Sequence, residues 1–364
     1  MLAVIETHPI QYRGPLYRML QRDFGVPVTA IYGSDFSVAG YRDPGFGQEL
    51  RWDVDLLSGY DSVFLTRVAA GGAKVMEDVK TDGLRATLRK INPTAVLVTG
   101  YSPRYHQAGF WHAWRGGWPI LFRGEATDLS PRGMARDAFL GLLYSRCRRV
   151  LYIGQSAKRH YLAHGVAEDK LVFSPYFVNT EPFDRDAPAP ARSERRVILF
   201  SGKLTEVKRP DLLIRAVQGM PVSLIFLGDG PLRPELERLA GELRVETQFT
   251  GFQNQTQLSP YYRAADMLCL PSDWDTWGLV VNEALYHGVP CVVSDRVGCA
   301  SDLITPGVTG DIFPAGSVAE LRAAIERVLP LTRQPATAQA CRERESHYTM
   351  ERAAAGIAET YRAL

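Results

Sequence analysis

Short apolar runs alternate with amphipathic segments along almost the whole chain, and this alternation limits the fold more than any other feature. The runs in the first half are LAVIE, VTAIY, TAVLVT, PILFR and VLYIG, and those in the second half are RVILFSG, VSLIFLG, DMLCLP and PCVVSD. Each run has the length of a strand that is buried on both faces. Helical patterns lie between the runs, at residues 14–22, 82–90, 209–218, 233–244 and 317–328. Strands that alternate with helices predict an α/β fold with parallel sheets and right-handed crossovers.

The length of the chain and one linker-like segment indicate two such domains. A chain of 364 residues with 46% hydrophobic residues is long for a single core. The segment FDRDAPAPARSERR, at 183–196, is rich in Pro, Ala and charge, which is typical of a linker. We therefore predict a Rossmann-like domain at 1–185, a linker at 186–196 and a second Rossmann-like domain at 197–347. The last segment, 348–364, has apolar residues at helical spacing and predicts a terminal helix.

Composition argues against several classes of protein. The chain has 42 Lys and Arg against 40 Asp and Glu, so it lacks the strong basic field of a nucleic-acid-binding protein. Its five cysteines form no C-x-x-C pair, which argues against a disulfide framework and against a structural zinc site. The N-terminus does not resemble a signal peptide, and no apolar run approaches the ~20 residues of a membrane span. We expect a cytoplasmic protein with no nucleic-acid partner.

The loops that follow strands are where an open α/β sheet binds its ligand. The loop SGKLTEVKRP places Gly202, Lys203 and Lys208 just before a helix, where two ammonium groups and the helix dipole favour a phosphate. The glycines of the next such loop, LGDGP, leave room for a ligand or for close backbone packing. A solvated charge run and a tight turn are the plain alternatives for these two loops. A third loop offers the backbone groups of Phe252 and Gln253.

Two carboxylates, Asp275 and Glu283, lie eight positions apart in the stretch SDWDTWGLVVNEALYHGVP. We expect Glu283 to lie within a helix and Asp275 to lie in the loop before it. A helix carboxylate at this position can accept hydrogen bonds from the two adjacent hydroxyls of a ribose. A surface acid and an ordinary loop acid are the plain alternatives.

The start of that helix predicts a second phosphate site. Thr276 is suited to cap a helix that begins near Trp277. The first amides of such a helix, those of Gly278 and Leu279, would then be free to bind an anion.

The order of these motifs resembles the carboxyl-terminal half of the retaining glycosyltransferases of family 4. The chain shows K-L-x-x-x-K, L-G-D-G-P, T-G-F and L-P-S, then an acid, seven residues and E-A, and finally HGVPCVVSDRVG and GVTGDIFPAGS. The resemblance covers roughly residues 197–330 and is weaker elsewhere. It implies the GT-B fold, in which two Rossmann-like domains face a cleft. It also implies a nucleoside-diphosphate-sugar donor in the second domain, an acceptor held mostly by the first, and no required metal or other cofactor.

The resemblance implies a role for each donor-site residue. The lysines would neutralise the diphosphate, the helix glutamate would hold the ribose, the loop aspartate would hold the donor sugar, and the T-G-F backbone would contact the base. The donor-binding set is Gly202, Lys203, Lys208, Phe252, Gln253, Asp275, Gly278, Leu279 and Glu283, and the set implied in catalysis is Lys203, Lys208, Asp275 and His106. The terminal helix would cross back onto the first domain.

Three positions depart from the family pattern. The family usually has Arg at Lys203, and a lysine replaces its planar fork by a point charge. The first acid is usually Glu, so Asp275 is one methylene shorter and must lie nearer the sugar or reach it through water. The paired glycines that often follow the first strand are replaced by THPIQYR. These departures bear on the donor sugar and the acceptor.

The first domain offers acceptor candidates in three loops. His106 best matches the histidine that the family often places near the donor sugar, and a histidine packed within a helix is the alternative. The acceptor-binding candidates are His8, Tyr12, Arg13, Arg104, Arg123 and Glu125. The segment RGMARDAFLGLLYSRCRRV has five arginines, at 132, 136, 146, 148 and 149, which suit either anionic lipid headgroups or a solvated surface.

Together with the patterns, the resemblance implies a metal-independent, retaining hexosyltransferase of the kind used in polysaccharide biosynthesis. Its donor would be a UDP- or GDP-sugar, and its acceptor a glycan, a lipid-linked molecule or a small molecule. We expect it in the cytoplasm, with peripheral contact at the inner face of the membrane. The triplets DVD, DWD and DRD resemble the metal-binding D-x-D of another glycosyltransferase fold, but none follows a strand with a second ligand nearby. A sugar-nucleotide epimerase on the same fold and a non-catalytic sugar-nucleotide sensor are the alternatives.

Overall fold

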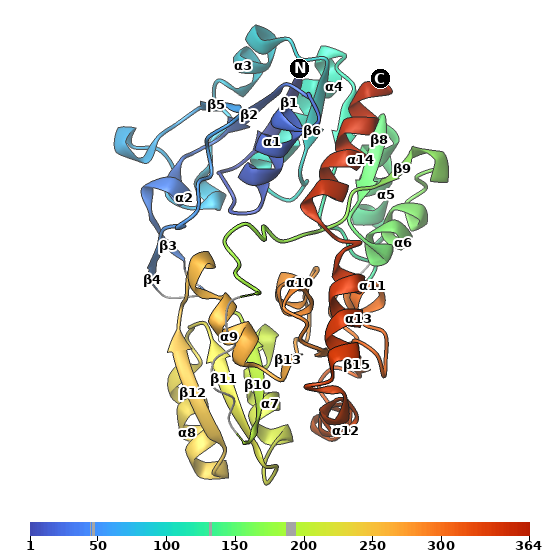
Figure 1. Cartoon of the computed structure of the whole chain (residues 1–364). Coiled ribbons are helices and arrows are strands. Elements are labelled where there is room, and N and C mark those ends of the chain that lie inside the picture. Colours follow the sequence, from blue (N-terminus) through green and yellow to red (C-terminus); the bar gives the residue numbers. More distant parts are fainter. Residues whose placement is uncertain (44, 46–47, 131–132, 187–193) are drawn as a thin grey trace. The chain divides into compact units, whose positions relative to one another are not determined.

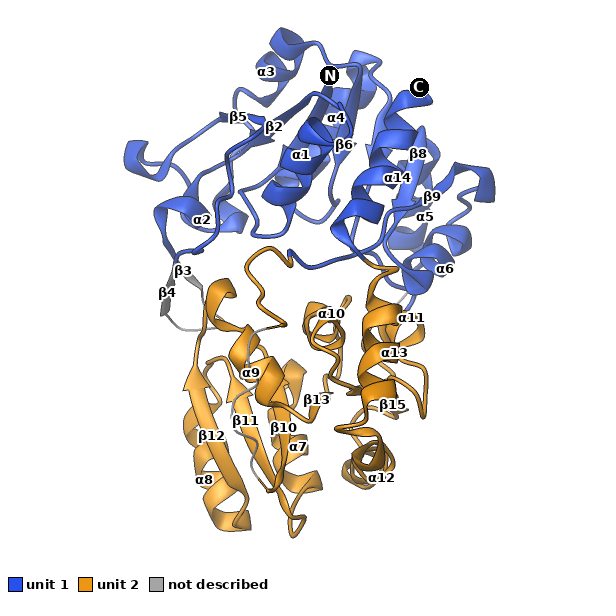
Figure 2. Ribbon diagram, in the orientation of Figure 1, with its two compact units in different colours: residues 1–41, 49–179, 349–364 blue, residues 42–48, 180–348 orange. Residues whose placement is uncertain are grey.

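The chain folds into two compact units, each built on its own parallel sheet (Figures 1 and 2). The computed structural model describes residues 1–43, 45, 48–130, 133–186 and 194–364. Unit 1 comprises Met1–Tyr41, Glu49–Asn179 and Thr349–Leu364, and unit 2 comprises Arg42–Gln48 and Thr180–Tyr348.

Unit 1 has a seven-stranded sheet in the order β5-β2-β1-β6-β7-β8-β9, with parallel pairing throughout. The strands are β1 (Leu2–Glu6), β2 (Val28–Tyr32), β5 (Asp61–Phe64), β6 (Ala95–Val98), β7 (Ile120–Phe122), β8 (Arg149–Tyr152) and β9 (Leu171–Phe173). The helices are α1 (Arg13–Arg22), α2 (Phe36–Ala39), α3 (Leu84–Ile91), α4 (Arg104–Gly116), α5 (Met134–Ser145), α6 (Gln155–Ala163) and α14 (Met350–Arg362), with 3-10 turns η1 (Val68–Ala70), η2 (Met76–Asp78) and η3 (Glu168–Lys170). Every residue of β1 and β2 is buried, which is why both strands are unbroken apolar runs in the sequence. A separate two-stranded sheet joins β3 (Tyr41–Asp43) and β4 (Gln48–Leu50).

The terminal helix α14 packs within unit 1, where the sequence predicts it. It lies against α1, and Ala353 and Ile357 join the core formed by Leu16 of α1 and the first strands. Gly356 allows the close approach, because a Cβ there would lie 2.3 Å from the carbonyl oxygen of Phe173.

Unit 2 has a six-stranded parallel sheet in the order β12-β11-β10-β13-β14-β15. The strands are β10 (Arg196–Ser201), β11 (Val222–Leu227), β12 (Glu246–Gly251), β13 (Met267–Leu270), β14 (Cys291–Ser294) and β15 (Gly310–Phe313). The helices are α7 (Pro210–Ala216), α8 (Arg233–Leu243), α9 (Ser259–Ala264), α10 (Leu279–Tyr286), α11 (Ala300–Leu303), α12 (Val318–Val328) and α13 (Pro335–Glu345), with 3-10 turns η4 (Glu206–Lys208), η5 (Gln255–Gln257) and η6 (Leu329–Leu331). Leucines of α7, α8 and α12 form one core with the sheet, while α10 packs on β13, β14 and α13.

The division into units differs from the predicted one at two places. The first unit ends at Asn179 rather than at 185. Phe183 explains this shift, because its ring packs on Tyr286 and His287 of unit 2, with centroids 5.8 and 5.3 Å apart. The short segment Arg42–Gln48 also groups with unit 2. Most of the predicted linker, 187–193, lies outside the described residues.

Candidate active site

The strand order of unit 2 reverses between β10 and β13, which is where an open α/β sheet forms its ligand crevice. The loops after these two strands hold Lys203, Lys208 and Asp275, and Glu283 follows on the helix after the second loop. Because both strands are parallel, their carboxyl ends meet at the same edge of the sheet. The fold therefore brings the predicted donor residues of the two loops to one place.

Glu283 lies on α10 and is buried, with only 7% of its surface exposed. Its carboxylate accepts a hydrogen bond of 2.5 Å from the hydroxyl of Tyr262. The same hydroxyl lies 3.1 Å from that of Ser201, the last residue of β10. Burial raises the pKa of Glu283 to about 7, and the bond from Tyr262 opposes that rise. Glu283 is therefore a buried carboxylate with a fixed partner, and the surface-acid alternative is wrong.

His287 fixes the position of Tyr262. The two rings stack with centroids 5.2 Å apart and planes at 13°. Burial lowers the pKa of His287 to about 4, so the ring is neutral at pH 7 and has a single N–H. Its Nδ1 donates to the backbone carbonyl of Glu283 at 2.6 Å, and its Nε2 accepts from the Ser259 hydroxyl at 2.9 Å. The phenol and its carboxylate partner are thus both tied to one histidine.

Lys208 and Asp275 form an ion pair across the switch point. Lys208 ends η4, and Asp275 lies in the loop after β13, with side chains 23% and 16% exposed. Their predicted ligands, the diphosphate and the donor sugar, are covalently joined, so adjacent side chains are what those roles require. Lys203 lies nearby in the same loop as Lys208, and its side chain is against Gly45, where an added Cβ would lie 2.5 Å from Cδ and 2.9 Å from Nζ.

The helix after β13 begins later than the sequence predicts. α10 starts at Leu279 after Gly278, and no side chain caps it, so the predicted capping role of Thr276 is wrong. Residues 275–277 instead pair with the chain after β14, because the amide of Asp275 donates to the carbonyl of Arg296 at 3.1 Å. This pairing keeps the segment extended until Gly278, whose φ of +95° turns the chain into the helix.

The start of α10 nevertheless offers the predicted amides. Within the described part of the chain, no hydrogen bond to another protein group uses the amides of Gly278 and Leu279. The first amides of a helix have no partner inside the helix and carry its positive dipole end. These two N–H groups are therefore available to an anion.

The glycines of LGDGP serve backbone packing. A Cβ on Gly228 would lie 2.0 Å from the carbonyl oxygen of Gly202, and one on Gly230 would lie 2.5 Å from that of Leu204. The amide of Leu204 also donates to the carbonyl of Asp229 at 2.9 Å. The loops after β10 and β11 are therefore in direct backbone contact, and glycine is required for that contact.

Phe252 and Gln253 follow β12, beside the loop after β11. The amide of Gly228 donates to the carbonyl of Gly251 at 3.0 Å, and the Gln253 side chain donates to the carbonyl of Thr250 at 3.1 Å. Their contact with a nucleotide base stays a prediction.

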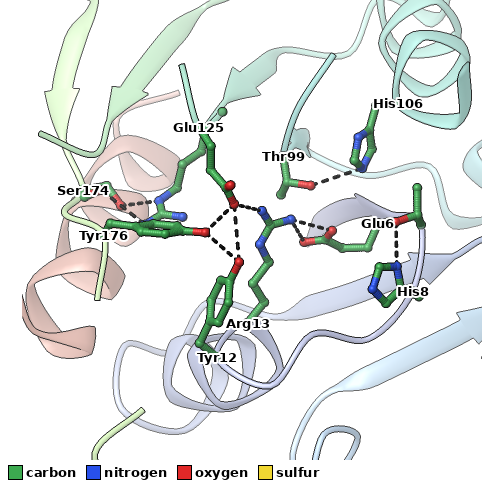
Figure 3. A network of polar contacts seen from close by, with 12 residues as sticks. Glu6, His8, Tyr12, Arg13, Thr99, His106, Glu125, Ser174 and Tyr176 are labelled. Atoms are coloured by element: carbon green, nitrogen blue, oxygen red, sulfur yellow. Dashed lines mark hydrogen bonds and ion pairs between the residues drawn. The ribbon is translucent and has the colours of Figure 1, made fainter. Parts of the chain in front are cut away.

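Unit 1 contains a second polar cluster, shown in Figure 3, that centres on Arg13. The Arg13 guanidinium is buried, and it donates to both oxygens of buried Glu6 at 3.0 and 2.8 Å and to Glu125 at 2.8 Å. Glu125 also accepts from the hydroxyls of Tyr12, at 3.4 Å, and Tyr176, and its side chain is 35% exposed. Arg13 is therefore committed to two carboxylates, and Glu125 is the member of the cluster that faces solvent.

His106 is buried on α4 and has one nitrogen without a partner. Its Nε2 lies 3.4 Å from the Thr99 hydroxyl, which itself donates to the carbonyl of Ile5. That hydroxyl must therefore accept, so Nε2 carries the proton and Nδ1 is a bare acceptor. Nδ1 has no hydrogen-bond partner among the described residues, and it faces Gly100, where a Cβ would lie 3.2 Å away. Burial, reinforced by Arg13, lowers the pKa of His106 to about 3, so the ring is neutral.

The remaining acceptor candidates have different surroundings. Arg123 is buried and donates to Ser174 and to the carbonyl of Pro175 at 2.7 Å, which makes it a structural tie. His8 bonds to the Thr7 hydroxyl at 2.9 Å, and burial with Arg13 lowers its pKa to about 3. Arg104 is exposed at the start of α4. Of the predicted set, Tyr12, Arg13 and Glu125 share one cluster.

The described residues form no metal cluster and no disulfide. Within them, no three His, Cys, Asp or Glu side chains gather closely enough to hold a metal ion, and all five cysteines are buried and unpaired by disulfides. No helix in the described ranges combines the length and the hydropathy needed to span a bilayer.

Comparison with known proteins identifies unit 2. Residues 183–345 match the family model of the glycosyl transferases group 1. The match spans almost all of unit 2, which comprises Arg42–Gln48 and Thr180–Tyr348. A D-inositol 3-phosphate glycosyltransferase of Mycobacterium tuberculosis is 33% identical to this chain over 165 residues, which covers 42% of this chain and 34% of the relative. The chain thus matches about a third of the length of such curated relatives.

Two solved structures match the whole chain in fold. Sucrose-phosphate synthase from Thermosynechococcus elongatus is 18% identical with a TM-score of 0.73, and covers 100% of this chain and 98% of its own. The Anabaena protein HepE, in complex with UDP-glucose, is 15% identical with a TM-score of 0.72, and covers 100% of this chain and 99% of its own. The predicted GT-B fold class, with two Rossmann-like units, is confirmed. The predicted cleft between the two domains stays a prediction.

Proposed function

We propose that this protein is a retaining glycosyltransferase that moves a hexose from a UDP- or GDP-sugar to an acceptor. The observation that carries the proposal is the buried Glu283 carboxylate at the β10/β13 switch point, held by Tyr262 within a domain of the group 1 family. A structure of the Anabaena HepE protein with UDP-glucose, which shares the fold, supports a nucleotide-sugar donor.

The donor would lie along α10 and the two flanking loops. Glu283 would accept hydrogen bonds from the ribose hydroxyls, and the free amides of Gly278 and Leu279 would bind the diphosphate. Lys208 bridges this arrangement, because its ammonium already contacts Asp275, which we assign to the hydroxyls of the donor sugar. The order along the chain, sugar carboxylate, amides, ribose carboxylate, is the order of the groups in a sugar nucleotide.

Catalysis would consist mainly of stabilising the departing diphosphate. As the bond from the anomeric carbon to the phosphate oxygen breaks, negative charge grows on the diphosphate and the sugar becomes oxocarbenium-like. Lys203, Lys208 and the positive end of α10 would stabilise that charge from fixed positions. The acceptor oxygen would bond to the anomeric carbon on the face that the diphosphate leaves, and its proton would pass to a diphosphate oxygen. No separate strong base is then needed.

Unit 1 would supply the contacts to the acceptor. Glu125 is a partly exposed carboxylate that Arg13 and two tyrosines hold in place. It is therefore suited to accept a hydrogen bond from a hydroxyl of a glycan, a lipid-linked molecule or a small molecule. The bare Nδ1 of His106 would accept a sugar hydroxyl. We further propose that no metal is required, and that the protein works in the cytoplasm with peripheral contact at the inner face of the membrane.

The proposal is tested by incubating the protein with UDP-, GDP- and ADP-sugars, with and without candidate acceptors, and separating the products. A glycosyltransferase releases nucleoside diphosphate in step with acceptor glycosylation, and NMR of the product shows the donor's anomeric configuration. Conversion of the sugar nucleotide without an acceptor would indicate an epimerase. Binding with no turnover on any donor would indicate a sensor.

A further inference from the structure

The outer faces of α4 and α5 in unit 1 expose an unusual number of large apolar side chains. Five of the eleven exposed large hydrophobic residues in the described chain lie on these two helices: Trp111 (48%), Trp114 (40%), Met134 (92%), Phe139 (49%) and Leu142 (59%). The inner face of α4 packs into the core through other residues, among them Phe110 and Ala113. The exposed set is therefore not needed to hold these helices in place.

The exposed aromatic residues line a groove and are ordered by arginines. Trp111, Trp114, Phe139 and Leu142 line one apolar hollow together with Arg146. The two indole rings lie 5.1 Å apart, with the Arg115 guanidinium over Trp111 at 5.4 Å and that of Arg146 over Trp114 at 5.1 Å. Each tryptophan is thus presented beside a cation that stays at the surface.

Two further hollows adjoin this groove and are basic. One shares Trp114 and Arg146 with the groove, and the other shares Trp111. The cations that line the three hollows are Arg85, Arg89, Arg115, Arg146, Arg148 and Lys170. No carboxylate lines any of the three among the described residues. The acid on α5, Asp137, is outside these linings and bonds to His164 at 3.3 Å.

The exposed aromatic side chains and the surrounding cations together indicate which partner would bind this groove. A second copy of the chain, related by a two-fold axis, would bring the same arginines against one another with no acid to offset them. An anionic phospholipid surface matches both features, because the rings enter the headgroup region while the arginines bind phosphates. The charge pattern therefore favours a lipid surface over self-association.

We propose that this surface, made of Trp111, Trp114, Phe139 and Leu142 with the six surrounding cations, docks the protein onto a bilayer that contains anionic phospholipids. It goes beyond the arginine helix predicted from the sequence, because the tryptophans come from α4, Arg136 is bonded to Tyr101 instead, and Arg132 lies outside the described residues. None of the residues of this surface belongs to the donor site, so the inference holds or fails independently of the proposed activity.

The test is co-sedimentation of the full chain with vesicles of phosphatidylcholine plus phosphatidylglycerol and with vesicles of phosphatidylcholine alone. We expect binding to the anionic vesicles that weakens as salt rises. The double variant Trp111→Ser/Trp114→Ser should lower the partition coefficient roughly tenfold or more, because it removes the apolar area that would be buried. Replacing Arg115 and Arg146 by Gln should lower it about fivefold for each arginine.

Matched controls separate the surface from general stickiness. Leu142→Ser should weaken binding, while Leu162→Ser, at a 41%-exposed leucine on α6, should not. This single-residue pair also decides the matter if the tryptophan variant does not fold. Circular dichroism and UDP affinity should be unchanged in each variant, so failure of docking and failure of the donor site are read separately.

Four outcomes would overturn the proposal. The wild type would not bind anionic vesicles, or Leu142→Ser and Leu162→Ser would behave alike. Alternatively, ultracentrifugation would show a dimer that Leu142→Ser dissociates while vesicle binding is absent. Loss of vesicle binding on addition of inorganic phosphate at constant ionic strength would indicate a simple phosphate site and not a bilayer-docking surface.

Discussion

Replacing Tyr262 by Phe should shift the pH at which the protein binds its nucleotide. In the wild type, burial raises the pKa of Glu283 to about 7, and the Tyr262 hydroxyl, at 2.5 Å, favours the ionised form. A hydrogen bond to a charged group contributes about 1.5–3 kcal/mol, and each pKa unit corresponds to about 1.4 kcal/mol. Without the hydroxyl, the pKa of Glu283 should therefore rise to roughly 8–9.

The direction of the pH dependence follows from the protonation state of Glu283 that binds ribose. Only the ionised Glu283 can accept both ribose hydroxyls, so affinity rises as pH passes through the pKa. The ionised fraction at pH 7 should fall from about one half to between roughly one tenth and one hundredth in Tyr262→Phe. UDP should then bind about five- to fiftyfold more weakly at pH 7, with most of the loss recovered at pH 9.

Calorimetric titration with UDP at several pH values measures this effect. Because a phosphate of UDP also titrates near pH 6, the quantity to compare is the ratio of the variant and wild-type dissociation constants at each pH. Tyr261→Phe is the matched control, since it removes a hydroxyl from the same helix with no bond to Glu283. A ratio that stays the same from pH 6 to pH 9 would refute the coupling of Tyr262 to a ribose-binding Glu283.

Three further predictions concern catalysis, metals and stability. Lys208→Ala and Lys203→Ala should lower kcat more than they raise the donor KM, because charge on the diphosphate grows in the transition state; steady-state kinetics would contradict this by showing a raised KM with normal kcat. Activity should survive EDTA, since Asp273 and Asp275 of the DWD triplet already pair with Arg209 and Lys208, whereas complete loss restored by Mn²⁺ would favour the metal-binding alternative. Arg13→Met should lower the free energy of unfolding by about 3–5 kcal/mol in denaturant titration, because it removes the cation paired with buried Glu6. A loss below about 1 kcal/mol would show that the Arg13–Glu6 pair contributes little to stability.

The sequence predicts the central strands of both sheets and misses the edges. The missed strands β5, β9, β12 and β15 are the outer strands of their sheets. An edge strand is covered less completely, as in β12, where every residue of ETQFTG is exposed or half-buried, so its sequence lacks an apolar run. The buried central strands carry the pattern because both of their faces are packed.

The donor residues could be predicted from the sequence because each follows a strand, but their hydrogen-bond partners could not. The βαβ order predicts the positions of the loops and the helix that contain Lys208, Asp275 and Glu283. Tyr262 belongs to α9, and nothing in its local sequence marks it as a partner of Glu283. Its contact depends on how α9 and α10 pack on the sheet, which the spacing of apolar residues does not specify.

The ion pairs of Arg13 in unit 1 also could not be predicted from the sequence. Arg13, predicted as an acceptor contact, is buried between Glu6 and Glu125. The positions of the two carboxylates in the sequence do not predict these ion pairs, because Glu6 is in β1 and Glu125 follows β7. The signal that existed was a charged residue inside an apolar strand, Glu6, because a buried carboxylate needs a cation or donors.

The central claim, that the β10/β13 switch point holds a nucleoside diphosphate with its ribose on Glu283, is tested most directly by calorimetry with free UDP and GDP. The wild type, Glu283→Gln and Asp275→Asn are titrated at pH 8, where Glu283 is mostly ionised. We predict that Glu283→Gln weakens binding of the preferred nucleotide roughly ten- to hundredfold, because a charged hydrogen bond is lost. Asp275→Asn should leave that affinity nearly unchanged, because Asp275 is assigned to the donor sugar. Unchanged affinity in a folded Glu283→Gln protein would contradict the account.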